Sequence, residues 1–219
     1  MNDRMTVDQL EPIAEALRRN RMVAHCVSAK EDVLPLVKQL LNPESTVAVG
    51  GSETLFQTGV IDLLKNGEYS FLDRYAEGLT AAQRDEVLLS SMAVDTYLCS
   101  SNAITRDGEL YNVDGRANRV AALAYGPKTV IVVAGCNKIV DNIPAAVRRV
   151  KTVAAPLNAK RLHCDTYCAA RGVCKAVDSA RYTDGCGSPD RICSAYLISG
   201  WQRIANRIHV ILVGEPLGF

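Results

Sequence analysis

Short apolar runs alternate along the chain with segments of helical spacing, and this alternation limits the fold more than any other feature. The clearest run, residues 129–134, reads Thr-Val-Ile-Val-Val-Ala and is apolar at every position but the first. A strand without alternating polar positions is typical of a parallel sheet that helices cover on both faces. Near the start of the chain, apolar residues instead recur at helical spacing, as at Leu10, Ile13 and Leu17. The pattern predicts an α/β fold with a mostly parallel sheet flanked by helices.

The same interpretation divides the chain into the elements of one domain. Strands are predicted at residues 46–49, 96–99, 129–134, 195–199 and 207–213. Helices are predicted at residues 7–20, 28–41, 81–91 and 117–124, after Ser52, and from Asp141 or Asn142 onward. A chain of 219 residues is long enough for a single domain with a full core. We therefore interpret residues 1–219 as one domain, with N-terminal helices over residues 1–45 and a cysteine-rich metal-binding loop over residues 163–193.

The overall charge gives no reason to expect nucleic acid or a membrane surface as a partner. The chain carries 25 Lys and Arg against 24 Asp and Glu, for a formal net charge of +1. Its first residues lack the apolar stretch of a signal peptide, and its apolar runs are far too short to span a bilayer. We expect a cytoplasmic protein, and reducing conditions there favour metal binding over disulfides where cysteines cluster.

Four cysteines gather in a polar segment near the end of the chain. Cys168, Cys174, Cys186 and Cys193 are separated by five, eleven and six residues, and Cys164 is a possible fifth member. Thiolates brought together on one loop select zinc, iron–sulfur clusters or Cu(I). The spacing matches neither the close pairs of a zinc ribbon nor the common ferredoxin runs. We expect a metal or cluster site, with disulfides or unlinked thiols as the alternatives.

Polar loops follow three of the predicted strands, and parallel sheets bind ligands at such strand ends. The first loop is a glycine turn that leads into a helix, where N–H groups and hydroxyls suit an anion. The second, between residues 100 and 119, is dense in Asn, Asp and Gly, and the third follows residues 129–134. The candidate ligand-binding residues are Gly50, Gly51, Ser52 and Thr54 in the first loop, Asn102, Asn112, Asp114, Asn118 and Arg119 in the second, and Asn137 and Lys138 in the third.

Arg119 and Lys138 are the candidate anchors for an anion. A guanidinium group can hold a carboxylate or phosphate through two parallel hydrogen bonds, whereas an ammonium group acts as a point charge. Each loop also has a purely structural interpretation: a turn capped by Ser52, a hairpin with Asn and Asp caps, and a surface lysine. The second loop holds more polar residues than a hairpin needs, which favours binding.

Several motifs occur in order along nearly the whole chain. They are NAITRDG at residues 102–108, NVDG at 112–115 followed by Asn118-Arg119-Val120, GPK at 126–128, AAPLNAKR at 154–161, SPDRIC at 188–193 and LVGEPLG at 212–218. Together with the Gly50-Gly51-Ser52 turn, they make the chain resemble the lactate-utilisation (LUD) domain family.

The resemblance implies a fold related to the isomerase and coenzyme-A-transferase group. It also implies a link to the oxidation of L-lactate to pyruvate by a multi-subunit system whose other members carry iron–sulfur clusters. In members with a cysteine tail, a Cys-x5-Cys pair precedes a third cysteine and a Ser-Pro-x-Arg-Ile-Cys motif. This chain matches that pattern at its four clustered cysteines, but residues 175–185 lengthen one gap and Tyr167 stands where Pro is common.

Three functions are compatible with these features. The first is a redox or accessory component of 2-hydroxy acid oxidation, with a 4Fe–4S cluster on the cysteines, a small organic anion at the polar loops and iron–sulfur subunits as partners. The second is a non-redox small-anion-binding protein, or a transferase- or isomerase-like enzyme, with a structural zinc. The third is a regulatory or scaffold subunit. Each of these functions is compatible with a homo-oligomer. They differ in whether the chain itself is an enzyme, and the sequence leaves that question open.

Overall fold

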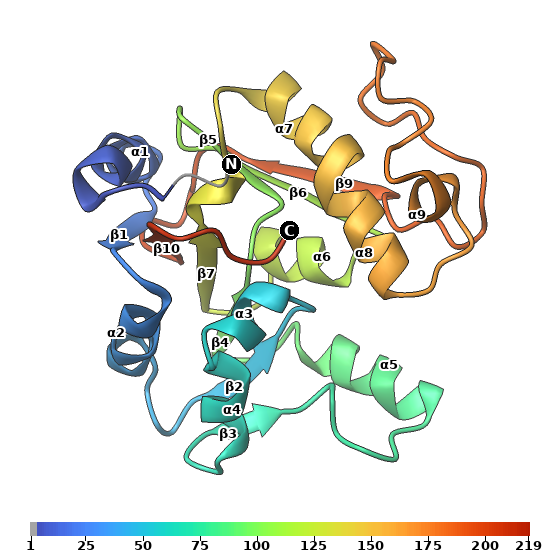
Figure 1. Ribbon diagram of the computed structural model, residues 1–219. Coiled ribbons are helices and arrows are strands. Elements are labelled where there is room, and N and C mark those ends of the chain that lie inside the picture. The colour runs from blue at the N-terminus through green and yellow to red at the C-terminus, as the bar shows by residue number, and fades with distance from the viewer. Residues whose placement is uncertain (1–3) are drawn as a thin grey trace.

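The computed structural model describes residues 4–219 as two sheets with helices packed around them (Figure 1). In the larger, six-stranded sheet every neighbouring pair of strands is parallel. From one edge to the other, its strands are β1 (Val23–Val27), β10 (Ile208–Val213), β7 (Thr129–Gly135), β4 (Thr96–Cys99), β2 (Thr46–Val49) and β3 (Ser70–Leu72). The predicted α/β fold with a mostly parallel sheet is confirmed.

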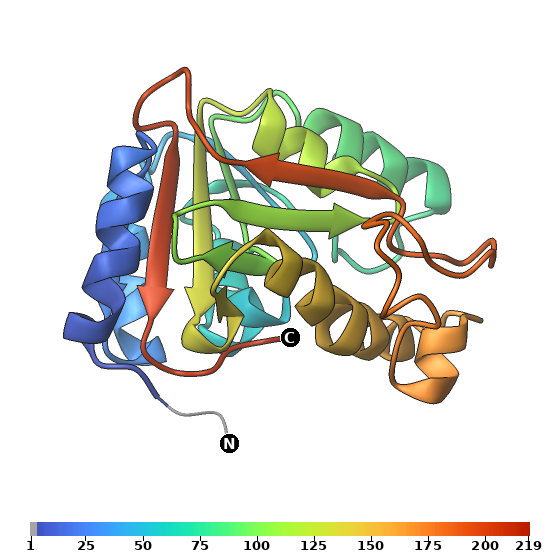
Figure 2. The ribbon, with the colours of Figure 1, turned by 90° about the horizontal axis from the view of Figure 1, so that it is seen from above.

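A second, four-stranded sheet branches from the carboxyl ends of β4 and β7. Its order is β8 (Ile139–Val140), β5 (Ala103–Thr105), β6 (Leu110–Asp114) and β9 (Ala195–Ser199). Only β8 and β5 are parallel, and the other pairs are antiparallel. Figure 2 shows β6 and β9 side by side, running across the direction of β7 and β10. The strand expected at residues 195–199 thus belongs to this second sheet.

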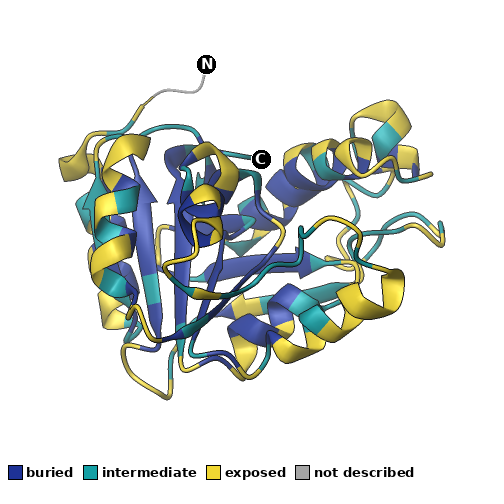
Figure 3. Ribbon diagram, turned by 90° about the horizontal axis from the view of Figure 1, so that it is seen from below, coloured by how far each residue is buried: buried dark blue, intermediate teal, exposed yellow. Residues whose placement is uncertain are grey.

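Helices cover both faces of the parallel sheet, as strand β7 requires. Its Val130 and Val132 pack on one face with α1 (Val7–Arg19), α6 (Asn118–Ala124) and residues of the second sheet. Ile131 and Val133 pack on the opposite face, which α2 (Val33–Leu40), α3 (Glu53–Gln57) and α4 (Val60–Lys65) cover. Successive side chains of a strand point to opposite faces, so β7 has no polar side chain after Thr129 because both faces of the sheet are buried (Figure 3).

The N-terminal region holds a strand as well as the expected helices. Helix α1 begins after Thr6, whose side chain and that of Gln9 form a capping box. Strand β1 follows and was not predicted, because His25 interrupts its short apolar run. As an edge strand it pairs with β10 alone, so it does not need a continuous apolar sequence. The helix expected from residue 28 begins as a 3-10 turn (Lys30–Asp32) and continues as α2; residues 1–3 lie outside the described residues.

One long, contiguous helix supports the second sheet. It consists of α7 (Ile143–Arg149), a π-helical turn (Val150–Ala154) and α8 (Ala155–Arg161). Asn142 caps its start by accepting a hydrogen bond from the Ala145 N–H at 3.0 Å, as expected. Val147 and Val150 pack against Tyr111 of β6 in a third apolar cluster. The short helix α9 (Tyr167–Arg171) then opens the cysteine-rich segment, which lies beside α8 in Figures 1 and 2.

The remaining helix, α5 (Ala81–Ser90), lies on the outside of the fold and buries none of its residues. It matches the helix predicted at residues 81–91. No helix within residues 4–219 has both the length and the apolar character needed to cross a membrane.

Candidate functional site

A cavity of about 310 Å³ lies at the carboxyl end of the parallel sheet, and we call it the strand-end cavity. Four of its lining residues follow four different strands: Ser52 follows β2, Ser100 follows β4, Lys138 follows β7 and Gly218 follows β10. Helix α8 closes another side. The carboxyl ends of parallel strands meet at one edge, so loops far apart in the sequence converge there as the sequence predicted.

Most of the predicted ligand-binding residues line this cavity. They are Gly51, Ser52, Thr54, Asn102, Asp114, Asn118, Arg119 and Lys138. Gly50, Asn112 and Asn137 do not line it and instead support those that do. A side chain at Gly50 would lie 3.1 Å from both Arg119 Cδ and the Tyr97 hydroxyl, so glycine leaves room for Arg119. Asn137 accepts a hydrogen bond from the Leu217 N–H and donates one to the Gly218 carbonyl, which fixes the last residues beside the cavity.

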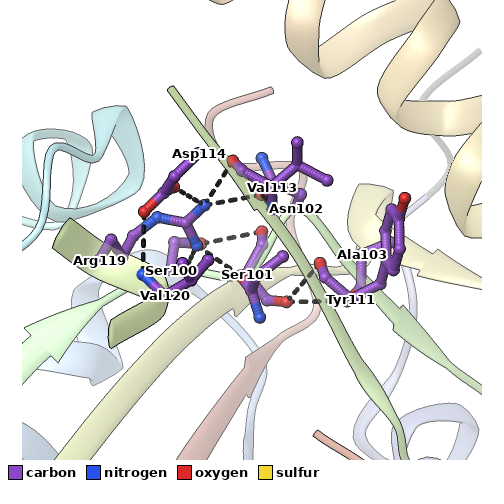
Figure 4. A network of polar contacts seen from close by, with 10 residues as sticks. Ser100, Ser101, Asn102, Ala103, Tyr111, Val113, Asp114, Arg119 and Val120 are labelled. Carbon is purple, nitrogen blue, oxygen red and sulfur yellow. Dashed lines mark hydrogen bonds and ion pairs between the residues drawn. The ribbon is translucent and has the colours of Figure 1, made fainter. Parts of the chain in front are cut away.

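Arg119 organises the wall of the cavity through its terminal nitrogens (Figure 4). Nη2 donates to Asn102 Oδ1 at 2.8 Å, to the Val113 carbonyl at 3.0 Å and to Asp114 Oδ1 at 2.6 Å. Nη1 donates to the Ser100 carbonyl at 3.0 Å and to Asn112 Oδ1. Both terminal nitrogens are thus bonded within the protein. Arg119 therefore supplies charge and order to the cavity, and its fork is not free for a second carboxylate.

Asp114 completes this network. One of its oxygens accepts from Arg119, and the other accepts from the Val120 N–H at 2.9 Å in the first turn of α6. The carboxylate therefore joins the end of β6 to a helix N-terminus, where negative charge is favourable. Both side chains of the Arg119–Asp114 pair are only 10% exposed, so the pair depends on its hydrogen bonds for compensation.

Lys138 is the most unusual group in the cavity. It lies in the 3-10 turn Cys136–Lys138 after β7 and is 3% exposed. Its Nζ donates to Thr54 Oγ1 at 3.0 Å and to Ser100 Oγ at 2.8 Å, and no carboxylate among residues 4–219 pairs with it. Burial, together with the positive charges of Arg149 and Arg119, lowers the pKa of Lys138 to about 7.

Sequence reasoning missed several polar residues on the far side of the cavity. Arg161, from α8, pairs with Glu53 at 3.3 Å and donates to Asn158 Oδ1. Arg74 lines the cavity but has neither an ion pair nor a hydrogen bond within the described residues. Asn158 and Arg161 belong to the AAPLNAKR motif, so the sequence offered a signal for them. Arg74 follows the edge strand β3 without any motif, so nothing in the sequence pointed to it.

The charges leave a positive surplus in the strand-end cavity. Arg119 is compensated by Asp114, Arg161 by Glu53, and Arg116 by Asp85 at 2.8 Å. Arg74 has no carboxylate partner in residues 4–219, and neither has Lys138, which adds a second positive charge only when it is protonated. The cavity therefore suits a small anion, with the hydroxyl of Ser52 and the amide of Asn118 as further polar groups on its wall.

The four cysteines predicted as metal ligands line a second, smaller cavity of about 20 Å³, which we call the cysteine cavity. Cys168 and Cys174 are buried, and Cys186 and Cys193 are half-buried. Cys164 does not line the cavity. No disulfide joins any two cysteines within residues 4–219, so the structure contains none of the disulfides that were one alternative. No three His, Cys, Asp or Glu side chains within residues 4–219 gather closely enough to hold a single metal ion.

Cationic side chains hold the loop around the thiols. Arg191 donates from Nε to Cys193 Sγ at 3.3 Å and to the Cys193 carbonyl at 2.9 Å, and from Nη2 to the Thr183 carbonyl at 2.6 Å. Lys151, from the π-helical turn, donates to the carbonyls of Ala176 and Arg181. Burial raises the pKa of Cys168, so a bound metal is what would stabilise its thiolate.

The LUD domain family model matches residues 10–213 of the chain. The chain belongs to the LUD domain family. Membership confirms the family resemblance of the sequence and supports a role related to lactate utilisation. The solved structures similar to this LUD domain include a DUF162 family protein from Deinococcus radiodurans at 17% identity and a TM-score of 0.47, covering 95% of this chain and 99% of that one. No curated protein matches the chain.

In this LUD domain the strand-end cavity and the cysteine cavity have no lining residue in common, but residues next to each other in the chain line one or the other. Strand β6 contributes Tyr111 to the cysteine cavity and Val113 and Asp114 to the other. In the long helix, Ala154 lines one cavity and Ala155 the other. The adjacent residues Ile192 and Cys193 are likewise divided, because Ile192 lines the strand-end cavity and Cys193 lines the cysteine cavity. A group bound in one cavity therefore lies close to a group bound in the other.

Proposed function

We propose that this LUD-domain protein is a redox or accessory component of 2-hydroxy acid oxidation in the cytoplasm. In this proposal the strand-end cavity binds L-lactate or pyruvate, and the four cysteines hold a 4Fe–4S cluster. One observation carries the proposal: thiols scattered along a long loop line a single cavity, and residues adjacent to that lining in the chain line a second cavity that carries uncompensated positive charge.

The strand-end cavity supplies what a small organic acid requires. Arg74 is an uncompensated guanidinium and is available for a carboxylate, unlike Arg119. Hydroxyl and amide groups from Ser52 and Asn118 are suited to the 2-hydroxy or 2-oxo oxygen. The volume of about 310 Å³ leaves room for such an acid with accompanying water.

The donor set of the cysteine cavity fits an iron–sulfur cluster. Cys168, Cys174, Cys186 and Cys193 would hold it, and the Arg191 N–H that points at Cys193 Sγ is the type of contact that adjusts such a centre. A cluster is wider than a single ion, so its thiolates surround a cavity and do not meet at one point. When bound, such a cluster supplies one-electron transfer, for which iron–sulfur subunits are the expected partners.

Binding a cluster requires the cysteine cavity to widen. Tyr167 and Tyr182 line it and are 46% and 43% exposed, so both rings can turn outward without leaving a void in the core. In the loop that carries Cys186, Gly187 is exposed and Gly185 is half-buried. Ordering of this loop is therefore expected to accompany metal binding.

The test is iron and acid-labile sulfide analysis with an absorbance spectrum on anaerobically purified protein. We expect about four iron atoms per chain and a visible band that dithionite bleaches. Cys186→Ser should lose iron, whereas Cys164→Ser, a change in the same region but outside the cavity, should keep it. Colourless protein with stoichiometric zinc would overturn the cluster and favour the second candidate, a non-redox anion-binding or transferase- or isomerase-like protein with a structural zinc.

A further inference from the structure

Lys138 combines deep burial with the absence of a negative partner. Its amine lies between two hydroxyls, Thr54 Oγ1 and Ser100 Oγ, at 3.0 and 2.8 Å. A buried ammonium group without a carboxylate is costly, so lysines in this setting shift towards the neutral amine. The structure thus places a lysine in the strand-end cavity under conditions that oppose its charge.

The other groups that face Lys138 reinforce this effect. Arg149 donates to the carbonyls of Asn137 and Asn102 on one side, and Arg119 is fixed by its own network on another. The remaining titratable group that acts on Lys138 is Cys99, a fully buried thiol whose own pKa burial raises to about 12. Cys99 is therefore uncharged at neutral pH, and the field at the amine is positive.

These surroundings argue against Lys138 as a simple electrostatic anchor. An anchor for a carboxylate must stay charged. Arg74 meets that need at the same cavity, because its guanidinium lies 5.5 Å over the Tyr75 ring and pairs with no carboxylate within residues 4–219. A neutral amine with hydroxyls at both sides is instead suited to attack a carbonyl carbon. Burial of this kind is a known way to make a lysine nucleophilic near neutral pH.

We propose that Lys138 is a nucleophile that forms an imine with the carbonyl carbon of a 2-oxo acid held in the strand-end cavity. The inference rests on the proposed function, since it takes the same cavity and the same class of ligand. Arg74 holds the carboxylate, and the Thr54 and Ser100 hydroxyls carry protons to and from the reacting oxygen. Within the chain, the Lys138 side chain is the group that becomes covalently attached.

The step balances without an oxidant or reductant. The Lys138 nitrogen forms a bond to the 2-carbon while the carbonyl oxygen takes up a proton and becomes a hydroxyl. That proton comes from the amine, through the Thr54 and Ser100 hydroxyls; the new hydroxyl then leaves as water with the second amine proton, and a carbon–nitrogen double bond remains. Hydrolysis reverses the step and returns the free lysine and the 2-oxo acid.

Borohydride trapping tests the inference on the wild-type chain. The protein is incubated with pyruvate and sodium borohydride, and its intact mass and peptide map are measured. We expect one adduct per chain with the mass of a reduced pyruvyl group, located at Lys138. Lys138→Arg should abolish the adduct, and Lys160→Arg, which changes an exposed lysine of α8, should leave it unchanged. Because the peptide map identifies the site in wild-type protein, the result does not depend on a variant that folds.

Two further measurements separate this inference from the proposed function. A pyruvate-induced rise in melting temperature without any adduct would overturn the imine and leave anion binding intact. Adducts spread over exposed lysines would also overturn it. If pyruvate neither raises the melting temperature nor forms an adduct, the anion part of the proposed function fails together with the imine. Iron content then tests the cysteine part by itself.

Discussion

The strand-end cavity and the cysteine cavity are lined by neighbouring residues of the same segments but are built in different ways. The first is formed by the ends of four parallel strands, and buried hydrogen bonds of Arg119 and Lys138 fix its polar groups. The second is formed largely by a segment with one short helix, α9, and otherwise turns and loops. Its order depends on a few contacts from Arg191 and Lys151 to backbone carbonyls.

This difference in construction shows which of the two sites is formed by the fold itself. Strand ends in a parallel sheet are set by the packing of the whole core, so the strand-end cavity should persist without a ligand. In the proposed function a metal centre would supply much of the order of the thiol-lined loop, so the cysteine cavity should respond first when metal is withheld. Changes to the first site should therefore be seen in global stability, and changes to the second in metal affinity.

The largest effect on stability is expected from Arg119→Met, which removes the central side chain of the strand-end cavity. The change leaves the buried Asp114 carboxylate without its cation and removes the donors of five hydrogen bonds. Loss of one partner of a buried pair costs about 3–5 kcal/mol in the free energy of unfolding. Urea unfolding measures it, and Arg106→Met is the control because its pair with Asp141 is exposed and should cost about 1 kcal/mol or less. Equal losses in the two variants would contradict the structural role of Arg119.

Lys138→Met should show a pH-dependent effect of similar size. The folded-state pKa of about 7 lies below the ordinary value of 10.5, so the folded chain binds fewer protons than the unfolded chain between these values. Wild-type stability should rise relative to the variant as the pH increases from about 7 towards 10, by up to about 4 kcal/mol. Below pH 7 the full penalty of the buried charge is present. Parallel stability curves for the two proteins in urea at about pH 6 and pH 9 would rule out the shift.

The sequence predicted those features of the fold and of the two cavities that depend on local patterns. The apolar runs of β7 and β10 indicated the parallel sheet, because full burial leaves no polar position in such strands. The loops at the strand ends were predicted because polar residues follow directly after these apolar runs. The β5–β6 hairpin matches the structural interpretation of the second polar loop. Its assembly with β8 and β9 into a second sheet was not predicted, because β8 has only two residues and its pairing with β5 joins segments more than thirty residues apart.

Which side chains enter a cavity was harder to predict than which loops surround it. Asn112 and Asn137 lie in the right loops, yet one is fully buried beneath Arg119 and the other holds the C-terminal segment. Arg119 was expected to hold the ligand, but its fork is occupied by protein acceptors. The terminal nitrogens of Arg74, and not those of Arg119, have no protein acceptor within residues 4–219. Only the tertiary fold brings Arg74 to the cavity.

A smaller effect is expected from Gly218→Ala, which sharpens the comparison at the edge of the strand-end cavity. Gly218 has a left-handed φ of 58°, and an added methyl would lie 2.6 Å from Thr54 Oγ1 and 3.4 Å from Lys138 Nζ. Backbone strain alone costs about 1–2 kcal/mol. Gly78→Ala has the same type of backbone, with φ 76°, and nothing within 4 Å, so it is the matched control. Both variants should lose the stability that backbone strain costs, and Gly218→Ala should lose more because of its contact with Thr54. Only Gly218→Ala should weaken pyruvate binding, by about tenfold. Equal affinities in a titration would exclude contact between this edge and the ligand.

The smallest effect on the whole molecule, and the one that tests the other half of the comparison, is expected from Arg191→Gln. The change removes the N–H donated to Cys193 Sγ and the contacts that tie the loop to the carbonyls of Thr183 and Cys186. Loss of such a contact around a metal ligand typically lowers metal affinity by about 10-fold, or about 1.4 kcal/mol. Arg181→Gln is the control, since its pair with Asp184 leaves the Arg181 side chain 80% exposed.

Hydrogen exchange should locate the consequence of Arg191→Gln within residues 163–193 and leave the strands of the parallel sheet protected. Pyruvate binding should stay at the wild-type level, because no bond of Arg191 reaches the polar groups of Arg119 or Lys138. If the sheet instead loses protection together with the loop, the cysteine segment is part of the cooperative core. The two cavities would then be one structural unit and not a fold-built site beside a metal-ordered one.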